Sequence, residues 1–169
     1  MNIFAQVMGT FAIAVWVISI VLKRKKDIIL SQVVANAIYS VEYISLKAYS
    51  AASMNLLSFI RLFVYYLFAK KNKDLPKVIL VIFCFLIVVL GIFTYTGLLS
   101  IIPIIITLLY AYSLWQNNLM VVRIIYVGCA FIWIYYNLKV GAYVGVLGNF
   151  LEILFGIFSM LKYRNVSDK

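Results

Sequence analysis

Histidine is absent from the 169-residue chain, and aspartate and glutamate together number only five. Without an imidazole the chain has no histidine ligand for haem, no zinc site of the usual kind and no histidine-containing catalytic triad. The two cysteines, Cys84 and Cys129, each lie within a long apolar run, which favours buried thiols over a disulfide. We therefore expect neither an enzymatic activity nor a bound metal or cofactor.

Charged residues are also scarce, at 12%, whereas 66% of the residues are hydrophobic. Ordinary globular chains are about 45–50% apolar, so a soluble domain of this length has no means of hiding so much apolar surface. A bilayer is a solvent for such a chain, and the sequence predicts an all-α integral membrane protein in contact with lipid. The net charge of +10 lies in short clusters between apolar runs, which indicates membrane topology and no nucleic-acid partner.

Seven segments have the roughly 20 mostly apolar residues that a membrane-spanning helix needs. They are residues 3–22, 28–46, 49–69, 78–95, 98–115, 119–137 and 140–161. The connections are short, so consecutive helices are expected to run antiparallel. Pro76 precedes the fourth segment and suits the start of a helix.

The positive charges sort the loops into two groups. With the N-terminus outside, the inner loops and the C-terminal tail hold twelve Lys or Arg residues, and the outer loops hold only Lys47 and Lys139. The inner residues are Lys23, Arg24, Lys25, Lys26, Lys70, Lys71, Lys73, Lys77, Arg123, Lys162, Arg164 and Lys169. The positive-inside rule therefore predicts an outer N-terminus and a cytoplasmic C-terminus. The first cluster follows the first apolar segment, whereas a signal peptide carries its charge before it, so we expect an uncleaved helix.

The chain resembles itself at a shift of 94 residues. Matched residues include Ala48–Tyr49 with Ala142–Tyr143, Ser19 with Ser113, Asn55 with Asn149, Leu57 with Leu151, and Lys70 with Arg164. The shift aligns helices one to three with helices five to seven and leaves the fourth as a linker. It predicts parallel repeats in a 3+1+3 plan, divided at residues 1–71, 72–95 and 96–169. Chance similarity between apolar helices is the alternative.

Polar residues gather on one face of several predicted helices. In the second helix, Gln32, Asn36, Tyr39 and Tyr43 share a face, and Glu42 lies beside it near the outer end. Such stripes are either packing seams between helices or the wall of a solute site.

Two asparagines at matching positions of the repeat stand out. Asn55 and Asn149 lie some six to nine residues from the outer ends of their helices, roughly 10–14 Å deep at 1.5 Å per residue. Each side chain offers donors and an acceptor, which suits hydroxyls, amides or a sugar-like solute. We therefore predict that these two residues clamp a ligand near the midplane.

Arg61 and Glu152 are the costliest residues, because ionisable groups in hydrocarbon cost roughly 2.5–3.5 kcal/mol or more. Three interpretations stay open: an ion pair between the repeats, contact of Arg61 with an anionic group of the solute, or proton transfer by Glu152. Pro103 is expected to interrupt the fifth helix, and the repeat places Gly9 at the matching point of the first. The two positions are either hinges or static kinks.

The run from Gln32 to Asn36 and on to Tyr43, followed by 48–61, resembles the YgjV-type family of bacterial inner-membrane proteins, as do 95–103, 113–115, 133–137 and 141–143. The resemblance covers nearly the whole chain. It implies a multi-pass protein of the bacterial inner membrane and names no activity.

The 3+1+3 plan is also similar to that of the SWEET sugar transporters and their PQ-loop relatives. In that plan each triple-helix bundle contributes a pocket asparagine on its third helix, often with an aromatic residue on its second. Here Tyr39 precedes Asn55 by sixteen residues, and Trp133 precedes Asn149 by sixteen. The resemblance implies a pocket built on these four residues. The chain departs from the plan in lacking a Pro-Gln motif and in having only Pro103 among the hinge prolines.

The sequence therefore predicts a transporter of a small polar metabolite that rocks two triple-helix bundles around a central site. The predicted solute-binding residues are Asn36, Tyr39, Asn55, Trp133 and Asn149, and Arg61, Glu152 and Glu42 are expected to set charge preference or coupling. The alternative is a non-transporting membrane scaffold or accessory subunit, whose polar stripes would be packing seams. The sequence leaves open whether the chain forms a homo-oligomer.

Overall fold

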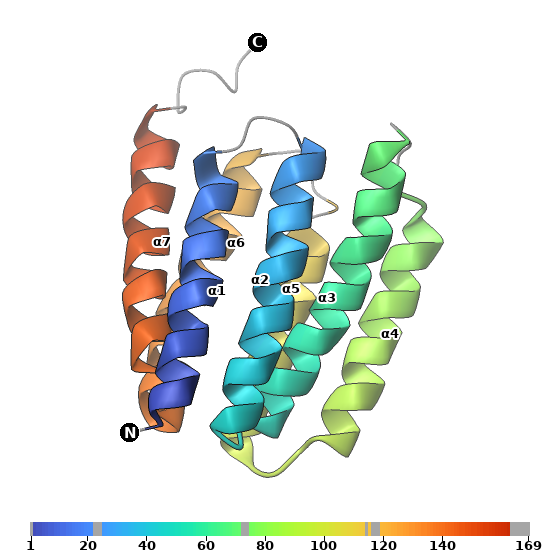
Figure 1. The fold of residues 1–169 in the computed structure, drawn as a ribbon. Coiled ribbons are helices and arrows are strands. Elements are labelled where there is room, and N and C mark those ends of the chain that lie inside the picture. The colour runs from blue at the N-terminus through green and yellow to red at the C-terminus, as the bar shows by residue number, and fades with distance from the viewer. Residues whose placement is uncertain (1, 22–24, 72–74, 114, 116–118, 163–169) are drawn as a thin grey trace.

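A computed structural model describes residues 2–21, 25–71, 75–113, 115 and 119–162 of the chain, and in these residues the secondary structure is helical throughout (Figure 1). The helices are α1 (Ile3–Val21), α2 (Lys25–Ser45), α3 (Tyr49–Lys70), α4 (Lys77–Phe93), α5 (Ile101–Ser113), α6 (Leu119–Val140) and α7 (Tyr143–Lys162), with a 3-10 turn at Leu98–Ser100 before α5. Each of the seven predicted segments coincides with one helix. The prediction of an all-α chain is confirmed.

The helices form one ring with a single helix outside it. Around the ring α1 packs on α2, α2 on α3, α3 on α5, α5 on α6, α6 on α7, and α7 on α1. Helix α4 packs on α3 and α5, and in Figure 1 it stands at the outer edge of the bundle beside α3. The ring therefore encloses an interior that six helices share.

Two tight turns join α2 to α3 and α6 to α7 with the same backbone geometry. Lys47 and Gly141 each adopt a left-handed conformation, with φ of 58° and 80°. The next residue of each turn donates its N–H to a carbonyl five residues back, Ala48 to Tyr43 and Ala142 to Asn137, both at 2.9 Å. This is the Schellman way of ending a helix.

The distribution of polarity is inverted relative to that of a soluble protein. Large apolar side chains are exposed on the outside of the bundle, as at Phe93 and Leu98, which are 82% and 80% exposed. The buried residues include Asn36, Glu42, Arg61 and Asn137. Monomeric soluble proteins seldom expose apolar patches this extensive, so the outer surface suits lipid.

Among the residues that the structure describes, two helical segments, Tyr49–Lys70 and Met120–Val140, are both long enough and apolar enough to span a membrane. Four more apolar helices are shorter: Ile3–Ile18, Lys77–Phe93, Leu98–Ser113 and Tyr143–Phe158. Helix α2 has the length, at 21 residues, but its inward face is polar.

The described charges lie where the predicted sorting puts them. The turn from α2 to α3 and the end of α6, which hold Lys47 and Lys139, lie at the end of the bundle where α1 begins. The end of α3 and the starts of α4 and α6, which hold Lys70, Lys77 and Arg123, lie at the other end (Figure 1). Lys23, Arg24, Lys73, Arg164 and Lys169 are outside the described residues, as is the predicted division between residues 71 and 72. Which end faces the cytoplasm stays a prediction.

The predicted interruption of the fifth helix is wrong. Helix α5 begins at Ile101, so Pro103 lies in its first turn, where the missing N–H breaks no helical hydrogen bond. Helix α1 likewise runs without a break through Gly9. A hinge role for either residue stays a prediction.

Candidate solute-binding cavity

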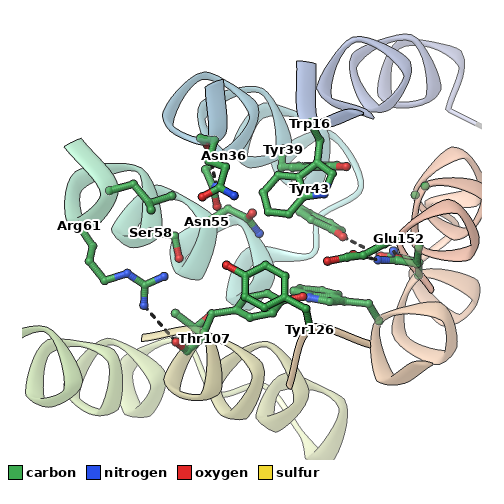
Figure 2. Close-up of a pocket in the computed structure, with 18 residues that line it drawn as sticks. Trp16, Asn36, Tyr39, Tyr43, Asn55, Ser58, Arg61, Thr107, Tyr126 and Glu152 are labelled. Carbon is green, nitrogen blue, oxygen red and sulfur yellow. Dashed lines mark hydrogen bonds between the residues drawn. The ribbon is translucent and has the colours of Figure 1, made fainter. Parts of the chain in front are cut away.

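A cavity of about 80 Å³ lies inside the ring of six helices (Figure 2). One water molecule needs roughly 10–15 Å³ on this scale, so the space holds several waters or a small solute. Its lining comes from α1, α2, α3, α5, α6 and α7, and α4 contributes none of the lining residues. Those residues are Trp16, Gln32, Asn36, Tyr39, Tyr43, Asn55, Ser58, Arg61, Leu62, Thr107, Tyr110, Tyr126, Trp133, Asn137, Gly145, Gly148, Asn149 and Glu152.

Most of the residues singled out from sequence meet at this cavity. The lining includes all five predicted solute-binding residues and both Arg61 and Glu152. Glu42, Gly9 and Pro103 do not line it. The sequence analysis placed Tyr43 on the polar face of the second helix without naming it as a solute-binding residue, and it did not single out Asn137, Tyr110 or Tyr126. A signal for Asn137 was present, because it stands one repeat shift of 94 residues after Tyr43.

A chain of hydrogen bonds crosses the cavity wall from α2 to α7. The Tyr43 hydroxyl donates to Oδ1 of Asn137 at 2.7 Å, and the Asn137 amide donates to Oδ1 of Asn149 at 3.0 Å. The Asn149 amide in turn donates to Oε2 of Glu152 at 3.3 Å. The chain fixes which way each amide points and holds the carboxylate in place.

Asn36 and Asn55 are anchored differently, each on its own helix. Asn36 donates to the Gln32 carbonyl at 2.8 Å, and Asn55 donates to the Ala51 carbonyl at 2.9 Å. One N–H of an asparagine amide makes this bond, so the second N–H and the side-chain oxygen have the capacity to bind a solute.

Arg61 and Glu152 lie at opposite sides of the cavity (Figure 2). Arg61 is 2% exposed and donates from Nη1 to the Thr107 carbonyl at 3.1 Å, while its Nε has no partner in the described structure. Glu152 accepts from Asn149 through Oε2, and its Oε1 has none either. Within the described residues the two side chains form no ion pair with each other, so that interpretation of the sequence is wrong.

Glu42 is another acid inside the bundle, and it does not line the cavity. Its side chain is fully buried, and neither carboxylate oxygen has a hydrogen-bond partner in the described residues. A Cβ added at Gly9 would lie 2.6 Å from Oε1 of Glu42. Gly9 therefore makes room for this carboxylate where α1 crosses α2.

Six pairs of lining residues are separated by the same 94 positions. They are Trp16 and Tyr110, Gln32 and Tyr126, Tyr39 and Trp133, Tyr43 and Asn137, Asn55 and Asn149, and Ser58 and Glu152. In three of these pairs both members are aromatic or both are amides. The two halves of the chain thus contribute to the cavity from matching positions.

Hydrogen bonds join the two halves at the end of the bundle where α1 begins. Ser50 at the start of α3 donates to the Ser100 carbonyl at 2.9 Å. Gln6 of α1 donates to the Gly141 carbonyl at 2.7 Å and accepts from the Val144 N–H at 3.1 Å. Just inside them the Tyr43 ring stacks on Trp133, with ring centroids 5.9 Å apart. These contacts, here named the seal, join the two halves at this end of the bundle.

The lipid-facing apolar surface and the buried polar interior define a multi-pass helical membrane protein. A family model described as Imp-YgjV, bacterial inner membrane protein, matches residues 3–167. The chain belongs to that family, and its place is the bacterial inner membrane. A comparison with curated proteins finds no match, and a comparison with solved structures finds none either.

Proposed function

We propose that this chain is a transporter of a small polar solute, in which two triple-helix bundles, α1–α3 and α5–α7, rock about the central cavity. The observation that carries the proposal is the pairing of Asn55 with Asn149 across that cavity, among six pairs of lining residues at one spacing. Solute sites of repeat-built transporters lie near the midplane, where the repeats meet.

The proposal includes a 3+1+3 parallel repeat spanning the membrane seven times, with the N-terminus outside. Its support goes beyond the lining. The turn at Lys47 has its counterpart at Gly141. The contact of Ser50 with Ser100 has its counterpart in the contact of Val144 with Gln6. Ser50 matches Val144, and Gln6 matches Ser100, at the same shift of 94 residues. Each half makes the same junction with the other, as a two-fold axis along the membrane normal requires.

The seal at the N-terminal end suits alternating access. The bonds from Gln6 and Ser50 close the cavity at the end that we assign to the outside. A transporter whose cavity is closed to the outside exchanges its solute with the cytoplasm. Breaking these bonds would let the cavity open to the outside instead. The scaffold alternative predicts a dry, packed centre, and the polar cavity supports a transporter instead.

The test is thermal unfolding of the purified protein with sugars, amino acids, nucleosides and organic acids. A solute that binds the folded state raises the midpoint by mass action. We expect a hit whose effect is lost in the Asn55→Ala, Asn149→Ala double variant. The matched control is the Leu56→Ala, Phe150→Ala double variant, because these residues follow the asparagines and point outward, 51% and 52% exposed. No hit in any class, or a hit that survives in the asparagine variant, contradicts the proposal.

A further inference from the structure

The cavity has an unpaired positive group on one side and an unpaired negative group on the other. Arg61, on α3, belongs to the first half of the chain, and Glu152, on α7, belongs to the second. Both are held in position by protein bonds, Arg61 through the Thr107 carbonyl and Glu152 through Asn149. Each still has one polar atom without a partner in the described structure, Nε of Arg61 and Oε1 of Glu152.

Charges in such a place are costly. Burying one ion costs several kcal/mol even after relaxation, and an opposite charge in good geometry offsets that cost. The chain does not use Arg61 and Glu152 to neutralise each other, although both line one cavity. A molecule bound between Arg61 and Glu152 would supply each of them with a group of opposite charge.

The charge pattern separates the classes of polar solute. A sugar or nucleoside leaves both ions unpaired. A simple carboxylate satisfies Arg61 and is repelled by Glu152, and a simple amine has the opposite problem. A molecule with an anionic and a cationic group meets both side chains at once.

We propose that the solute is a small zwitterion, an α-amino acid or a close analogue, with its carboxylate at Arg61 and its ammonium group at Glu152. The inference rests on the proposed transport function and names its substrate class. A guanidinium binds a carboxylate through parallel N–H bonds. The aromatic rings of Tyr110 and Tyr126, whose centroids are 4.7 Å apart, line the same space, and such rings attract an ammonium group.

The position of the two charges also explains how binding would act on the whole protein. The solute bridges α3 of one half to α7 of the other, so it is bound best in the conformation that brings both halves together. The cavity of about 80 Å³ has room for several waters, so amino acids with short side chains, such as alanine and serine, are the expected ligands.

The experiment compares alanine with three analogues that each lack one of its two charged groups, on the purified full-length protein, by thermal unfolding and by calorimetric titration. The analogues are N-acetylalanine without the ammonium group, alaninamide without the carboxylate, and lactate with a hydroxyl in place of the amine. We expect alanine to raise the unfolding midpoint, and the other three to bind at least tenfold more weakly.

Two substitutions test which charged group of the ligand binds to Arg61 and which binds to Glu152. Arg61→Gln should abolish discrimination between alanine and alaninamide, and Glu152→Gln should abolish discrimination between alanine and lactate. Lys139→Gln, at the end of α6 and outside the cavity lining, is the control for net charge. If a substituted protein fails to fold, the ligand series on the unmodified protein still decides.

The outcomes separate this inference from the transport proposal. Equal binding of alanine and its blocked analogues overturns the zwitterion. Binding of a sugar, nucleoside or simple acid that depends on Asn55 and Asn149, with no binding of amino acids, overturns the zwitterion and leaves the transport proposal standing. No binding by any class overturns both.

Discussion

Tyr43 and Asn137 stand 94 residues apart in the chain and are joined side chain to side chain by a buried hydrogen bond of 2.7 Å. The spacing equals the shift that superimposes the two halves of the sequence. If the halves are related by a two-fold axis, matching residues touch only close to that axis. The bond between Tyr43 and Asn137 therefore lies close to the proposed axis.

Removal of this bond should weaken the junction between the halves. Tyr43→Phe deletes the donor and leaves the Asn137 oxygen without it in a buried site. Hydrogen bonds in membrane proteins are worth about 0.5–2 kcal/mol, so a lower unfolding midpoint is expected. Tyr49→Phe is the control, since that ring is 56% exposed. Equal midpoints for the two variants would show that the bond does not hold the halves together.

Loosening the seal should admit reagents from the side where α1 begins. Cys84→Ser and Cys129→Ala first remove the two native thiols. In that background, the thiol of Ser58→Cys, which lies in the cavity, should not react with a membrane-impermeant thiol reagent added on that side. The same cysteine should react once Gln6→Ala and Ser50→Ala remove the sealing bonds.

The control for this labelling is Lys47→Cys, because Lys47 lies in the exposed turn between α2 and α3. It should react with the reagent added on that side in both backgrounds. Rapid labelling of the Ser58 cysteine with the seal intact would mean that the bonds of Gln6 and Ser50 do not close the cavity. Labelling of the Lys47 cysteine from the cytoplasm alone would reverse the predicted topology.

An added methyl group at Gly148 should weaken the contact between α7 and α1, because the side chain of Ile13 would have to move. A Cβ there would lie 2.7 Å from Cδ1 and 2.8 Å from Cγ1 of Ile13. Overpacking of this kind costs about 1–3 kcal/mol, against a gain of about 1 kcal/mol from replacing glycine in a helix. Gly128→Ala gains the same helix propensity in α6 and meets nothing within 4 Å. We expect a lower midpoint for Gly148→Ala than for Gly128→Ala, and the reverse order would refute close packing at this contact.

Glu42 and Glu152 should differ in their effect on ligand binding. Glu152 lines the cavity and Glu42 does not. Glu152→Gln should therefore weaken the binding of a zwitterion at least tenfold, whereas Glu42→Gln should change it less than twofold. The unfolding midpoint of Glu42→Gln should stay the same or rise, because the carboxylate is fully buried and its oxygens have no partner in the described residues. Equal losses of affinity would mean that both acids belong to one site.

The sequence was sufficient to predict the seven helices and most of the cavity. Long apolar runs bounded by charges fix helix ends closely, and the spacing of Gln32, Asn36 and Tyr39 fixes the polar face of α2. The depth of a residue follows from its distance to a helix end, which is why Asn55 and Asn149 could be expected at one level.

The direction in which a residue points round its helix was harder to predict. Arg61 and Glu152 stand at similar depth, yet they face the cavity from different sides and do not meet. In α6 the positions that match the polar face of α2 hold Tyr126, Trp133 and Asn137, two of them aromatic, so this face is harder to recognise as polar from the sequence. The place of Pro103 within its helix could not be predicted without the start of α5. The 3-10 turn at Leu98–Ser100 comes first, so α5 begins at Ile101, about one turn later than predicted.

The most direct test of transport is uptake of isotopically labelled small amino acids, organic acids, sugars and nucleosides into liposomes that contain the purified protein. The account predicts saturable uptake of a small amino acid, lost in the Asn55→Ala, Asn149→Ala variant and kept in the Leu56→Ala, Phe150→Ala variant. Uptake of every solute at the level of protein-free liposomes would contradict it.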